Sequence, residues 1–349
     1  MENKANLSRN NLDLLRLVFS SIVVFYHIPI LTRNSSLSAT HLHLSGQYAV
    51  ESFFVISGML IYRSYTKSSS LKSYFEKRFR RIYPAYFTVV VISAVALYFL
   101  STLPAAQYFG SGFWSYLSLN LLFLKPSGAL PGVFTSNYMR AVNGVLWTLR
   151  VEVLFYLSVP VIALLSRRLG TKAVLGVLFC LSILWKYVFQ WLSVTHSSNH
   201  IYADLQQELP GQLIYFIAGI ILLLYFDQLR HHFPAILCVS CCLFLADHFF
   251  FKGILDVLWV SGIVFVFGFW RYLGNFSKYG DFSYGTYIVH FPIIQAMTSL
   301  GLAKQKPIVF LLVTLSCILV VVFLLWHLVE KRFLAKSSHY RQVSMTVSG

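Results

Sequence analysis

Apolar stretches of about 20 residues recur along almost the whole chain, and they constrain its fold more than any other feature. As an α-helix, a run of that length crosses roughly 30 Å of hydrocarbon. Hydrophobic residues make up 57% of the 349 residues and charged residues only 11%, which is not the composition of a soluble domain. The sequence therefore predicts an all-α, polytopic membrane protein. We place ten spans, at residues 12–32, 47–64, 83–103, 144–166, 172–190, 210–227, 233–251, 254–271, 284–302 and 307–329.

The distribution of Lys and Arg predicts which side of the membrane each loop faces, because cytoplasmic loops are enriched in both. Ten spans and a cytoplasmic N-terminus put 19 of these residues on the inner side and 7 on the outer side, with Arg16 and Arg150 inside spans. If the short apolar segment 112–125 also crossed, the division would become 15 and 11. We therefore predict ten spans with both termini in the cytoplasm.

One membrane domain, residues 1–335, is predicted to carry the whole function, and a short polar cytoplasmic tail, residues 336–349, follows it. The net charge of +16 follows from the topology and from attraction to an anionic inner leaflet, so no nucleic-acid partner is predicted. All five cysteines lie in predicted spans, without a histidine at metal-ligand spacing, and no metal site is predicted.

The first predicted span carries three ionisable residues, Asp13, Arg16 and His27. Such side chains cost several kcal/mol within a span unless they face a partner or a water-filled cavity. Arg16 and His27 are 11 residues apart, which is about three turns and ~16 Å of rise, so they share one face of the helix. This arrangement indicates a polar pathway. The alternative is that Asp13 and Arg16 pair locally, while His27 lies at the outer interface.

A carboxylate is predicted at a similar depth in the fourth span. Glu152 lies about two turns into that helix from the outer side, a depth comparable with that of His27. Arg150 points to a nearly opposite face and is not an obvious partner. Glu152 is therefore a candidate partner of His27, and a structural salt bridge to another helix is the alternative.

The predicted inner loop, residues 63–82, holds seven Lys and Arg residues against the single acid Glu76. This composition is typical of a positive-inside anchor. Arg78 and Arg81 are three residues apart on what would be one helical face, a spacing that suits bidentate binding of a phosphate group. In the second span, Ser57-Gly58 permits close approach of another backbone, for helix packing or for a bound chain.

Six segments of the chain are distinctive as a set: LDLLRLVFSSIVVFYH, ESFFVISGMLIYRSY, KRFRRIYPAYF, LWTLRVEVLFYL, GDFSYGTYIVHFPII and HLVEKRF. Together they resemble the membrane acyltransferase 3 family, bacterial integral-membrane proteins that O-acetylate cell-surface polysaccharides. The resemblance runs nearly end to end. Thr148, where the family pattern has Ser, and Arg332, where a Pro often follows Glu-Lys, depart from it.

The resemblance implies a ten-helix domain in the bacterial inner membrane and acetyl-CoA as the donor, supplied from the cytoplasm. It implies that His27 and Glu152 lie at the reaction centre and that Arg78 and Arg81 bind the CoA donor. The acceptor would be a glycan or a lipid-linked oligosaccharide, which enters from outside.

The chemistry of acyl transfer suits these residue types. A sugar hydroxyl needs a base, and a neutral histidine such as His27 is the usual one. Glu152 would either orient the imidazole or hold the acceptor hydroxyl. Negative charge on the thioester oxygen needs fixed donors, which Arg16, the Trp147 indole or a helix-start amide could provide.

Four further polar residues are predicted to be structural. His290 in the ninth span is expected to be a buried, hydrogen-bonded residue, and Asp281 is expected to cap that span. His327 and Glu330 are expected to cap or pair locally at the inner end of the tenth span. The rival functional class is a transporter or a flippase of a lipid-linked sugar or small anion, in which an intramembrane Arg, His and Glu would form a relay.

Overall fold

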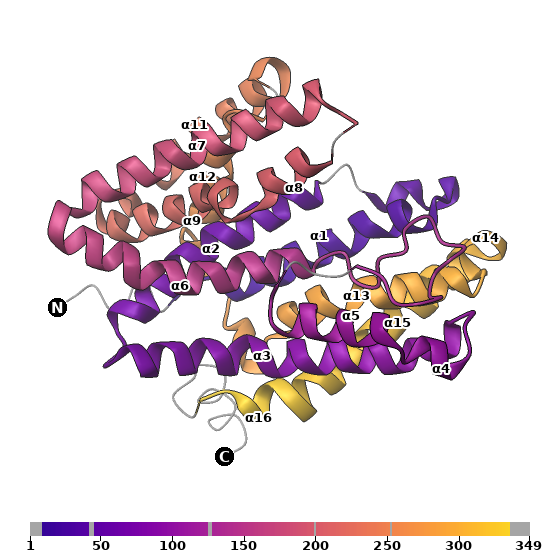
Figure 1. Ribbon diagram of the computed structural model, residues 1–349. Coiled ribbons are helices and arrows are strands. Elements are labelled where there is room, and N and C mark those ends of the chain that lie inside the picture. Colours follow the sequence, from indigo (N-terminus) through magenta and orange to yellow (C-terminus); the bar gives the residue numbers. More distant parts are fainter. Residues whose placement is uncertain (1–8, 42–44, 125–127, 199, 252, 336–349) are drawn as a thin grey trace. The chain divides into compact units, whose positions relative to one another are not determined.

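The computed structural model describes residues 9–335, except residues 42–44, 125–127, 199 and 252. All regular secondary structure in these residues is helical, which confirms the predicted all-α class (Figure 1). The α-helices are α1 (Leu12–Thr32), α2 (Gly46–Thr66), α3 (Leu71–Ala96), α4 (Ala105–Tyr108), α5 (Ser111–Leu121), α6 (Leu146–Leu169), α7 (Thr171–Thr195), α8 (Ile201–Gln207), α9 (Leu209–Leu224), α10 (Phe226–Leu229), α11 (Phe233–Ala246), α12 (Asp256–Phe269), α13 (Phe282–Ser299), α14 (Leu302–Gln305), α15 (Pro307–Leu325) and α16 (Lys331–Phe333).

Seven helical stretches of the described residues are long and apolar enough to cross a membrane. They are Leu12–Thr32, Leu71–Leu100, Leu146–Leu169, Thr171–Thr195, Ile201–Leu224, Phe226–Phe251 and Pro307–Phe333. The three other predicted spans are also helical, as α2, α12 and α13. The chain is therefore a multi-pass membrane protein, while the count of ten and the cytoplasmic termini stay predictions.

The helix surfaces are those of a lipid-facing protein. On α6, Leu157, Val161 and Leu164 are each more than half exposed and lie at helical spacing on one face. Phe155 and Val159 of the same helix are fully buried. A soluble helix would show the reverse on its outer face, so α6 packs inward through one stripe and meets hydrocarbon with the other.

The predicted loop 63–82 is wrong for most of its length, while the helical conformation predicted for Arg78 and Arg81 is confirmed, because both lie on α3. α2 runs on to Thr66, and α3 already begins at Leu71, so the connection is only residues 67–70. The charged turns are helical because Glu76 and Arg80 pair at i,i+4, 2.7 Å apart, and the buried Tyr74 hydroxyl donates to the Tyr156 carbonyl. The length of an apolar run predicts only the part of such a helix that lies in the membrane.

The segment 112–125 forms the short helix α5 and not a span. α5 has 11 residues, about 16 Å of helix, which falls short of a ~30 Å hydrocarbon core. Residue 125 and the predicted tail, residues 336–349, lie outside the described residues.

The chain divides into two compact units. Unit 1 contains residues 1–15, 50–75 and 151–275, and unit 2 contains residues 16–49, 76–150 and 276–349. In unit 1, α7 packs on α8 and α9, and α12 packs on α9 and α11; in unit 2, α13 packs on α15. Whether residues 1–335 act as one domain, as the sequence predicts, stays a prediction.

Gly58 and Gly219 mark a close crossing of α2 and α9 in unit 1. A Cβ atom at Gly58 would overlap the Phe216 carbonyl oxygen, and one at Gly219 would overlap the Val55 carbonyl oxygen. The close approach allowed by Ser57-Gly58 therefore serves helix packing, and not a bound chain.

Unit 1 also contains a buried ion cluster that the sequence did not predict. The Lys186 ammonium on α7 lies 2.6 Å from an Asp256 carboxylate oxygen and 3.8 Å from one of Glu51, and it donates to the Tyr215 hydroxyl. The side chains of Lys186, Glu51 and Asp256 are at most 3% exposed. Opposite charges at this depth stabilise one another, so these residues connect α7, α2, α12 and α9 within the unit.

Candidate active site

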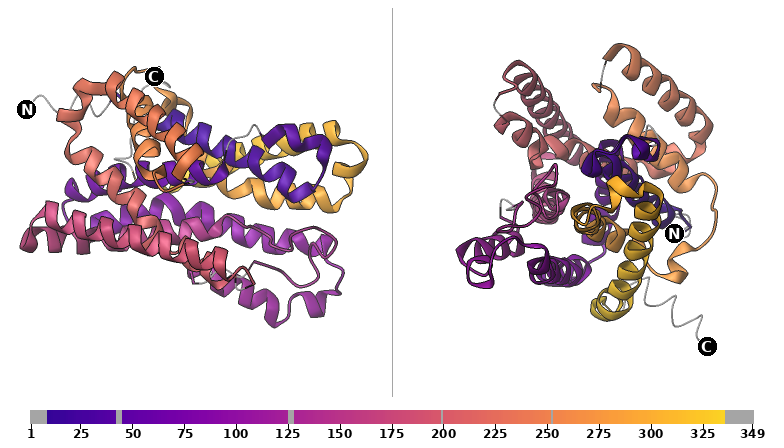
Figure 2. Two further views of the ribbon diagram at one scale, coloured as in Figure 1. Left: turned by 90° about the horizontal axis from the view of Figure 1, so that it is seen from above. Right: turned by 90° about the vertical axis from the view of Figure 1, so that its right-hand side faces the viewer.

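Two pairs of polar side chains join α1 to α13 in unit 2. Near the start of both helices, Arg16 Nη1 donates to Asp281 Oδ2 over 2.7 Å. Eleven residues further along α1, His27 Nδ1 lies 3.1 Å from His290 Nε2. Because the pairs occur in the same order on both helices, α1 and α13 run parallel (Figures 1 and 2). The ten-span topology requires these two helices to be parallel, because the first and ninth spans both run from the cytoplasmic side to the outer side.

The hydrogen bonds around the two imidazoles assign their tautomers. His27 Nδ1 lies 2.9 Å from the Val23 carbonyl oxygen, and His290 Nδ1 lies 3.1 Å from the Thr286 carbonyl oxygen. A carbonyl oxygen only accepts, so both Nδ1 atoms carry hydrogen in the neutral rings. His290 Nε2 is then a lone-pair acceptor that faces the N–H of His27. The lone pair of His27 is left on Nε2, the nitrogen that would act as a base.

The two histidines differ in accessibility. His290 is fully buried, whereas His27 is partly exposed. The Phe291 ring packs edge-on against the His27 ring, with centroids 5.2 Å apart, and limits its movement. His290 is thus a buried, hydrogen-bonded residue as predicted, but its partner is the candidate base itself. This contact is not predicted from the sequence, although the predicted topology places both histidines on helices that run outward from the cytoplasm.

Asp281 is the centre of a second polar cluster, at the start of α13. Its Oδ2 accepts from Arg16 and from Arg81 Nη2, and its Oδ1 accepts from the Ser283 backbone N–H over 3.1 Å and from the Ser283 hydroxyl. The predicted cap of the ninth span is therefore confirmed. A single carboxylate here begins one helix and joins it to two others, α1 and α3.

Glu330 completes this cluster. It ends the π-helical turn Trp326–Glu330, and its Oε2 lies 3.7 Å from Arg81 Nη1. The prediction that His327 and Glu330 cap or pair locally is therefore wrong for Glu330, which faces another helix. The His327 ring bonds locally, to the Phe323 carbonyl oxygen 2.9 Å away.

The electrostatics of the cluster favour an ionised Asp281. Burial alone would raise the pKa of this carboxyl, but the positive charges of Arg16 and Arg81 and two hydrogen bonds from Ser283 hold it well below its ordinary value. The Asp281 side chain is only 2% exposed. Asp281 at the start of α13 therefore joins Arg16, in the first turns of α1, to Arg81, which lies beyond the first turns of α3.

The structure separates the predicted site residues into two levels of unit 2. Arg16 and Arg81 meet at Asp281, and Arg78 lies one turn earlier on α3, partly buried. His27 lies about 16 Å further along α1. The predicted role of Arg16 at the thioester oxygen stays a prediction, and its position favours the end of the bundle at which the donor phosphates are expected.

Glu152 belongs to unit 1, where it accepts two hydrogen bonds. The Ser57 hydroxyl donates to its Oε2 over 3.1 Å, and the Tyr156 hydroxyl donates to its Oε1 over 3.0 Å. Two hydroxyl donors, one on each carboxylate oxygen, therefore hold the Glu152 side chain in one orientation. Its predicted pairing with His27, a residue of unit 2, stays a prediction.

Comparison with known proteins identifies the class. A family model described as an acyltransferase domain matches residues 9–327, and the chain belongs to this family, the acyltransferase 3 family. Over 336 residues the chain is 28% identical to an O-acetyl transferase of Shigella phage Sf6, covering 94% of this chain and 97% of that one. It is also similar to nodulation protein 10 of Rhizobium leguminosarum bv. viciae, at 34% over 172 residues, and to the acyltransferase MdmB of Streptomyces mycarofaciens, at 28% over 134 residues.

The partial matches cover 46% of this chain and 46% of nodulation protein 10, and 38% of this chain and 32% of MdmB. The chain therefore spans about half the length of nodulation protein 10 and a third of that of MdmB. No solved structure matches the chain. Family membership supports the first of the two predicted classes: the protein is a membrane acyltransferase.

We expect Asp281→Asn to destabilise the protein by about 3–5 kcal/mol, because two largely buried arginines lose their shared counter-ion. The folded pKa of Asp281 is lowered, so its contribution is present above the unfolded value of about 3.9 and is lost as the pH falls through the folded value. Thermal unfolding in detergent should therefore separate variant and parent at neutral pH and bring them together in acid. Asp227→Asn, which alters a half-exposed carboxylate 3.5 Å from Arg230, is the control and should change little. Equal stability of parent and Asp281→Asn at pH 7 would contradict the central role of this carboxylate.

Proposed function

We propose that the protein moves an acetyl group from cytoplasmic acetyl-CoA to a hydroxyl of a cell-surface glycan, such as O-antigen, capsule or exopolysaccharide, in a bacterial inner membrane. The observation that carries this proposal is the hydrogen bonding of the His27 imidazole within a membrane helix. Hydrogen bonds at Nδ1 hold the ring in place, the lone pair is left on Nε2, and the ring is partly exposed. The family and the printed name of the full-length phage relative support O-acetyl transfer.

In the proposed reaction, His27 Nε2 removes the proton of the acceptor hydroxyl as its oxygen attacks the thioester carbonyl. The C–O bond forms, the C–S bond breaks, and the CoA thiolate takes the proton back from the imidazolium. General-base catalysis of this kind typically contributes 10²- to 10⁴-fold. His290 keeps the ring in place by accepting from Nδ1–H, so it is a positioning residue that does not touch the substrate.

The donor is proposed to approach from the end of the bundle at which Arg78 and Arg81 lie. Phosphate groups are too polar to enter hydrocarbon, so they stay with these arginines at the membrane surface. The extended pantetheine arm would carry the thioester along α1 toward His27, about 16 Å away from Arg16. Asp281 already holds the guanidinium groups of Arg16 and Arg81 in place, so these groups would bind phosphate without further ordering of their side chains.

For Glu152 the proposal keeps two roles, orientation of the His27 imidazole and binding of the acceptor hydroxyl. Both need the ionised carboxylate as an acceptor. The hydrogen bonds from Ser57 and Tyr156 occupy one lone pair on each oxygen and leave further acceptor capacity.

His27→Ala should abolish glycan acetylation, a loss of at least about 100-fold, while the protein still inserts in the membrane. The assay measures acetyl ester on the surface glycan of cells that carry each variant at matched protein levels. His327→Ala is the matched control, because it removes a partly exposed histidine near the end of the last long helix, where its ring bonds only locally to the Phe323 carbonyl oxygen in the described residues. Acetylation at the parent level in His27→Ala would remove this residue from the mechanism.

Glu152→Gln keeps the shape of the side chain and an acceptor for Ser57 or Tyr156, but removes the negative charge. If the charge acts in the reaction, acetyl transfer should fall by at least about tenfold while thermal stability in detergent changes little. Transfer at the parent rate would leave Glu152 as a structural link between α6 and α2.

Replacing both Arg78 and Arg81 with Lys preserves the positive charge that sets topology but removes the planar, bidentate geometry. We expect normal insertion and acetyl-CoA binding that is about tenfold weaker or more, since a charge-assisted contact contributes about 1.5–3 kcal/mol. Arg80→Lys is the control, because Arg80 is exposed and pairs with Glu76 on the same helix. Unchanged donor affinity in the double variant would identify these arginines as topological anchors.

A further inference from the structure

The chain between α5 and α6 of unit 2 is held against α13 by one buried amide. The Gln295 side chain is fully buried, and its Nε2 donates to the carbonyl oxygens of Met139 and Ala141, over 2.7 Å in each case. Asn137 Nδ2 donates to Gln295 Oε1 over 2.9 Å. Every second residue of this short segment is therefore fixed to the same side chain.

The two residues between these anchor points are presented at the surface. Tyr138 is 60% exposed, and Arg140 is exposed as well. Arg33, the first residue after α1, lies over the Tyr138 ring, with its Cζ 3.6 Å from the ring centroid. Arg33 is also exposed. A guanidinium group and an aromatic ring are therefore stacked on one another where a ligand can reach both.

The backbone at Arg33 favours glycine and not arginine. Its φ of 49° lies in the left-handed region, and its N–H donates to the Pro29 carbonyl oxygen over 3.0 Å, which closes the last turn of α1. A side chain at such a position costs free energy that glycine would avoid. Strain of this kind is common at binding sites, and here it accompanies a guanidinium group placed on an exposed ring.

A third cation follows from the next residue of the chain. Asn34 Nδ2 donates to the Ala303 carbonyl oxygen over 2.5 Å and so joins the end of α1 to α14. The residue after Ala303 is Lys304, which is exposed. Figures 1 and 2 show α14 and the chain before α6 at the same end of unit 2. We call the four residues of this end the basic face: Arg33, Tyr138, Arg140 and Lys304.

The charge at this end is of one sign. The ten-span topology places residues 33–45, 101–145 and 300–306 outside the cytoplasm, and these segments contain five Lys and Arg residues and no Asp or Glu. Topology does not explain this excess, because Lys and Arg are enriched in cytoplasmic loops. A surface of one sign attracts ligands of the opposite sign. The basic face is therefore suited to an anionic partner on the outer side.

The same chain leads from the basic face to the candidate base. A Cβ atom at Gly144 would overlap the Phe291 ring, and that ring packs edge-on against His27. Asn143 Nδ2 donates to the Ile288 carbonyl oxygen over 2.8 Å, which holds this part of the chain on α13. Arg33 follows His27 by six residues, about 9 Å of helical rise. A chain of sugars bound at the basic face would therefore have to extend only a short way to reach the base.

We infer that the basic face binds the acceptor, and that the acceptor is an acidic glycan whose sugars carry carboxylate groups; this deepens the proposed function and rests on it. Arg33 and Arg140 suit a carboxylate, because the planar guanidinium fork binds both of its oxygens. Lys304 adds a third positive charge. Arg33 covers one side of the Tyr138 ring, and the exposed part of this ring remains for the apolar C–H face of a sugar.

An anionic lipid headgroup offers negative charge from another source. Phosphatidylglycerol would use the same cations, but it has no ring to pack on Tyr138. It also carries no sugar hydroxyl that extends toward His27. The acidic glycan is for these reasons the better match, and the lipid is an outcome that the experiment separates.

The test measures binding to the purified full-length protein in detergent by isothermal titration. The probes are oligogalacturonic acid, the same oligosaccharide after reduction of its carboxylates to neutral alcohols, and phosphatidylglycerol. We expect the parent to bind the acidic form about tenfold more tightly or better than the neutral form. Arg33→Gln with Arg140→Gln should remove this preference and leave binding of the neutral form unchanged. Tyr138→Leu should weaken both forms.

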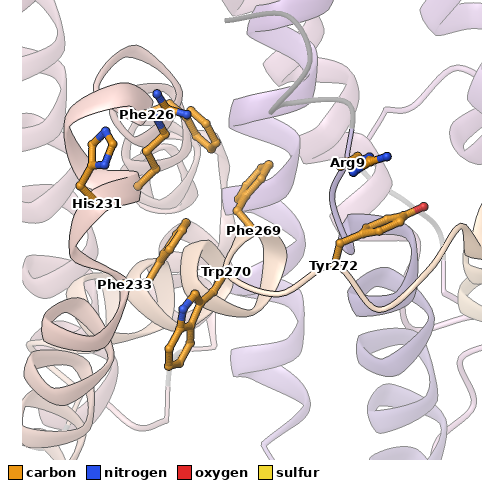
Figure 3. Close-up of a pocket in the computed structure, with 8 residues that line it drawn as sticks. Arg9, Phe226, His231, Phe233, Phe269, Trp270 and Tyr272 are labelled. Atoms are coloured by element: carbon orange, nitrogen blue, oxygen red, sulfur yellow. The ribbon is translucent and has the colours of Figure 1, made fainter.

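Two further variants separate binding from folding. Arg33→Gly suits the positive φ, so it should keep the thermal stability of the parent and still lose affinity for the acidic form. Arg9→Gln is the matched control, because Arg9 is exposed, precedes α1 instead of following it, and lies beside Tyr272 at a cavity of unit 1 (Figure 3). Its loss should leave the affinity for the acidic form unchanged.

Each other outcome contradicts the inference or the proposed function. If the parent binds the acidic and neutral forms equally, or the double variant keeps the preference, the basic face does not bind an acidic glycan, while His27-dependent transfer leaves the proposed function standing. If the double variant loses only phosphatidylglycerol, the basic face is a lipid site and the inference is wrong. If the parent binds the acidic form but transfers no acetyl group to any glycan, the proposed function fails and the basic face remains only a glycan-binding surface.

Discussion

The site depends on one constraint: a charged side chain within or at the edge of a membrane bundle must be given a partner. Asp281 supplies it for Arg16 and Arg81, and the same carboxylate caps α13. The starts of α1 and α13 are thereby joined to each other and to an inner turn of α3. Because the start of α1 is tied to the start of α13, the two helices run parallel, and His27 meets His290 about three turns later.

This arrangement gives the site two levels with different chemistry. At the level of Asp281, arginine side chains are charged and already oriented, which suits phosphate groups that remain in water. At the level of His27, the Val23 carbonyl oxygen and His290 Nε2 both face Nδ1 of the imidazole. In the neutral ring, this leaves Nε2 as the basic nitrogen. The proposed donor is long, with phosphate at one end and a thioester at the other, and would match such a separation.

Much of this could be predicted from the sequence, and the failures have physical causes. Helix positions follow from apolar length, and Arg16, Arg81 and Asp281 stand out as polar residues at span ends. The pairing of His27 with His290 and of Lys186 with Asp256 could not be predicted, because these partners are 263 and 70 residues apart and no periodicity connects them. The early start of α3 was missed because its first turns are stabilised by charges and aromatic contacts, which apolar length does not detect.

The central claim is tested most directly by acetyl transfer across a sealed vesicle. The purified protein is reconstituted, acetyl-CoA with a labelled acetyl group is supplied on the side of the chain termini, and O-antigen, capsular or exopolysaccharide glycan is supplied on the other side. The account predicts that labelled ester appears on one of the glycans, that free CoA appears on the donor side in equal amount, and that His27→Ala does neither. Glycan or anion movement without ester formation, or ester formation that does not need His27, would contradict it.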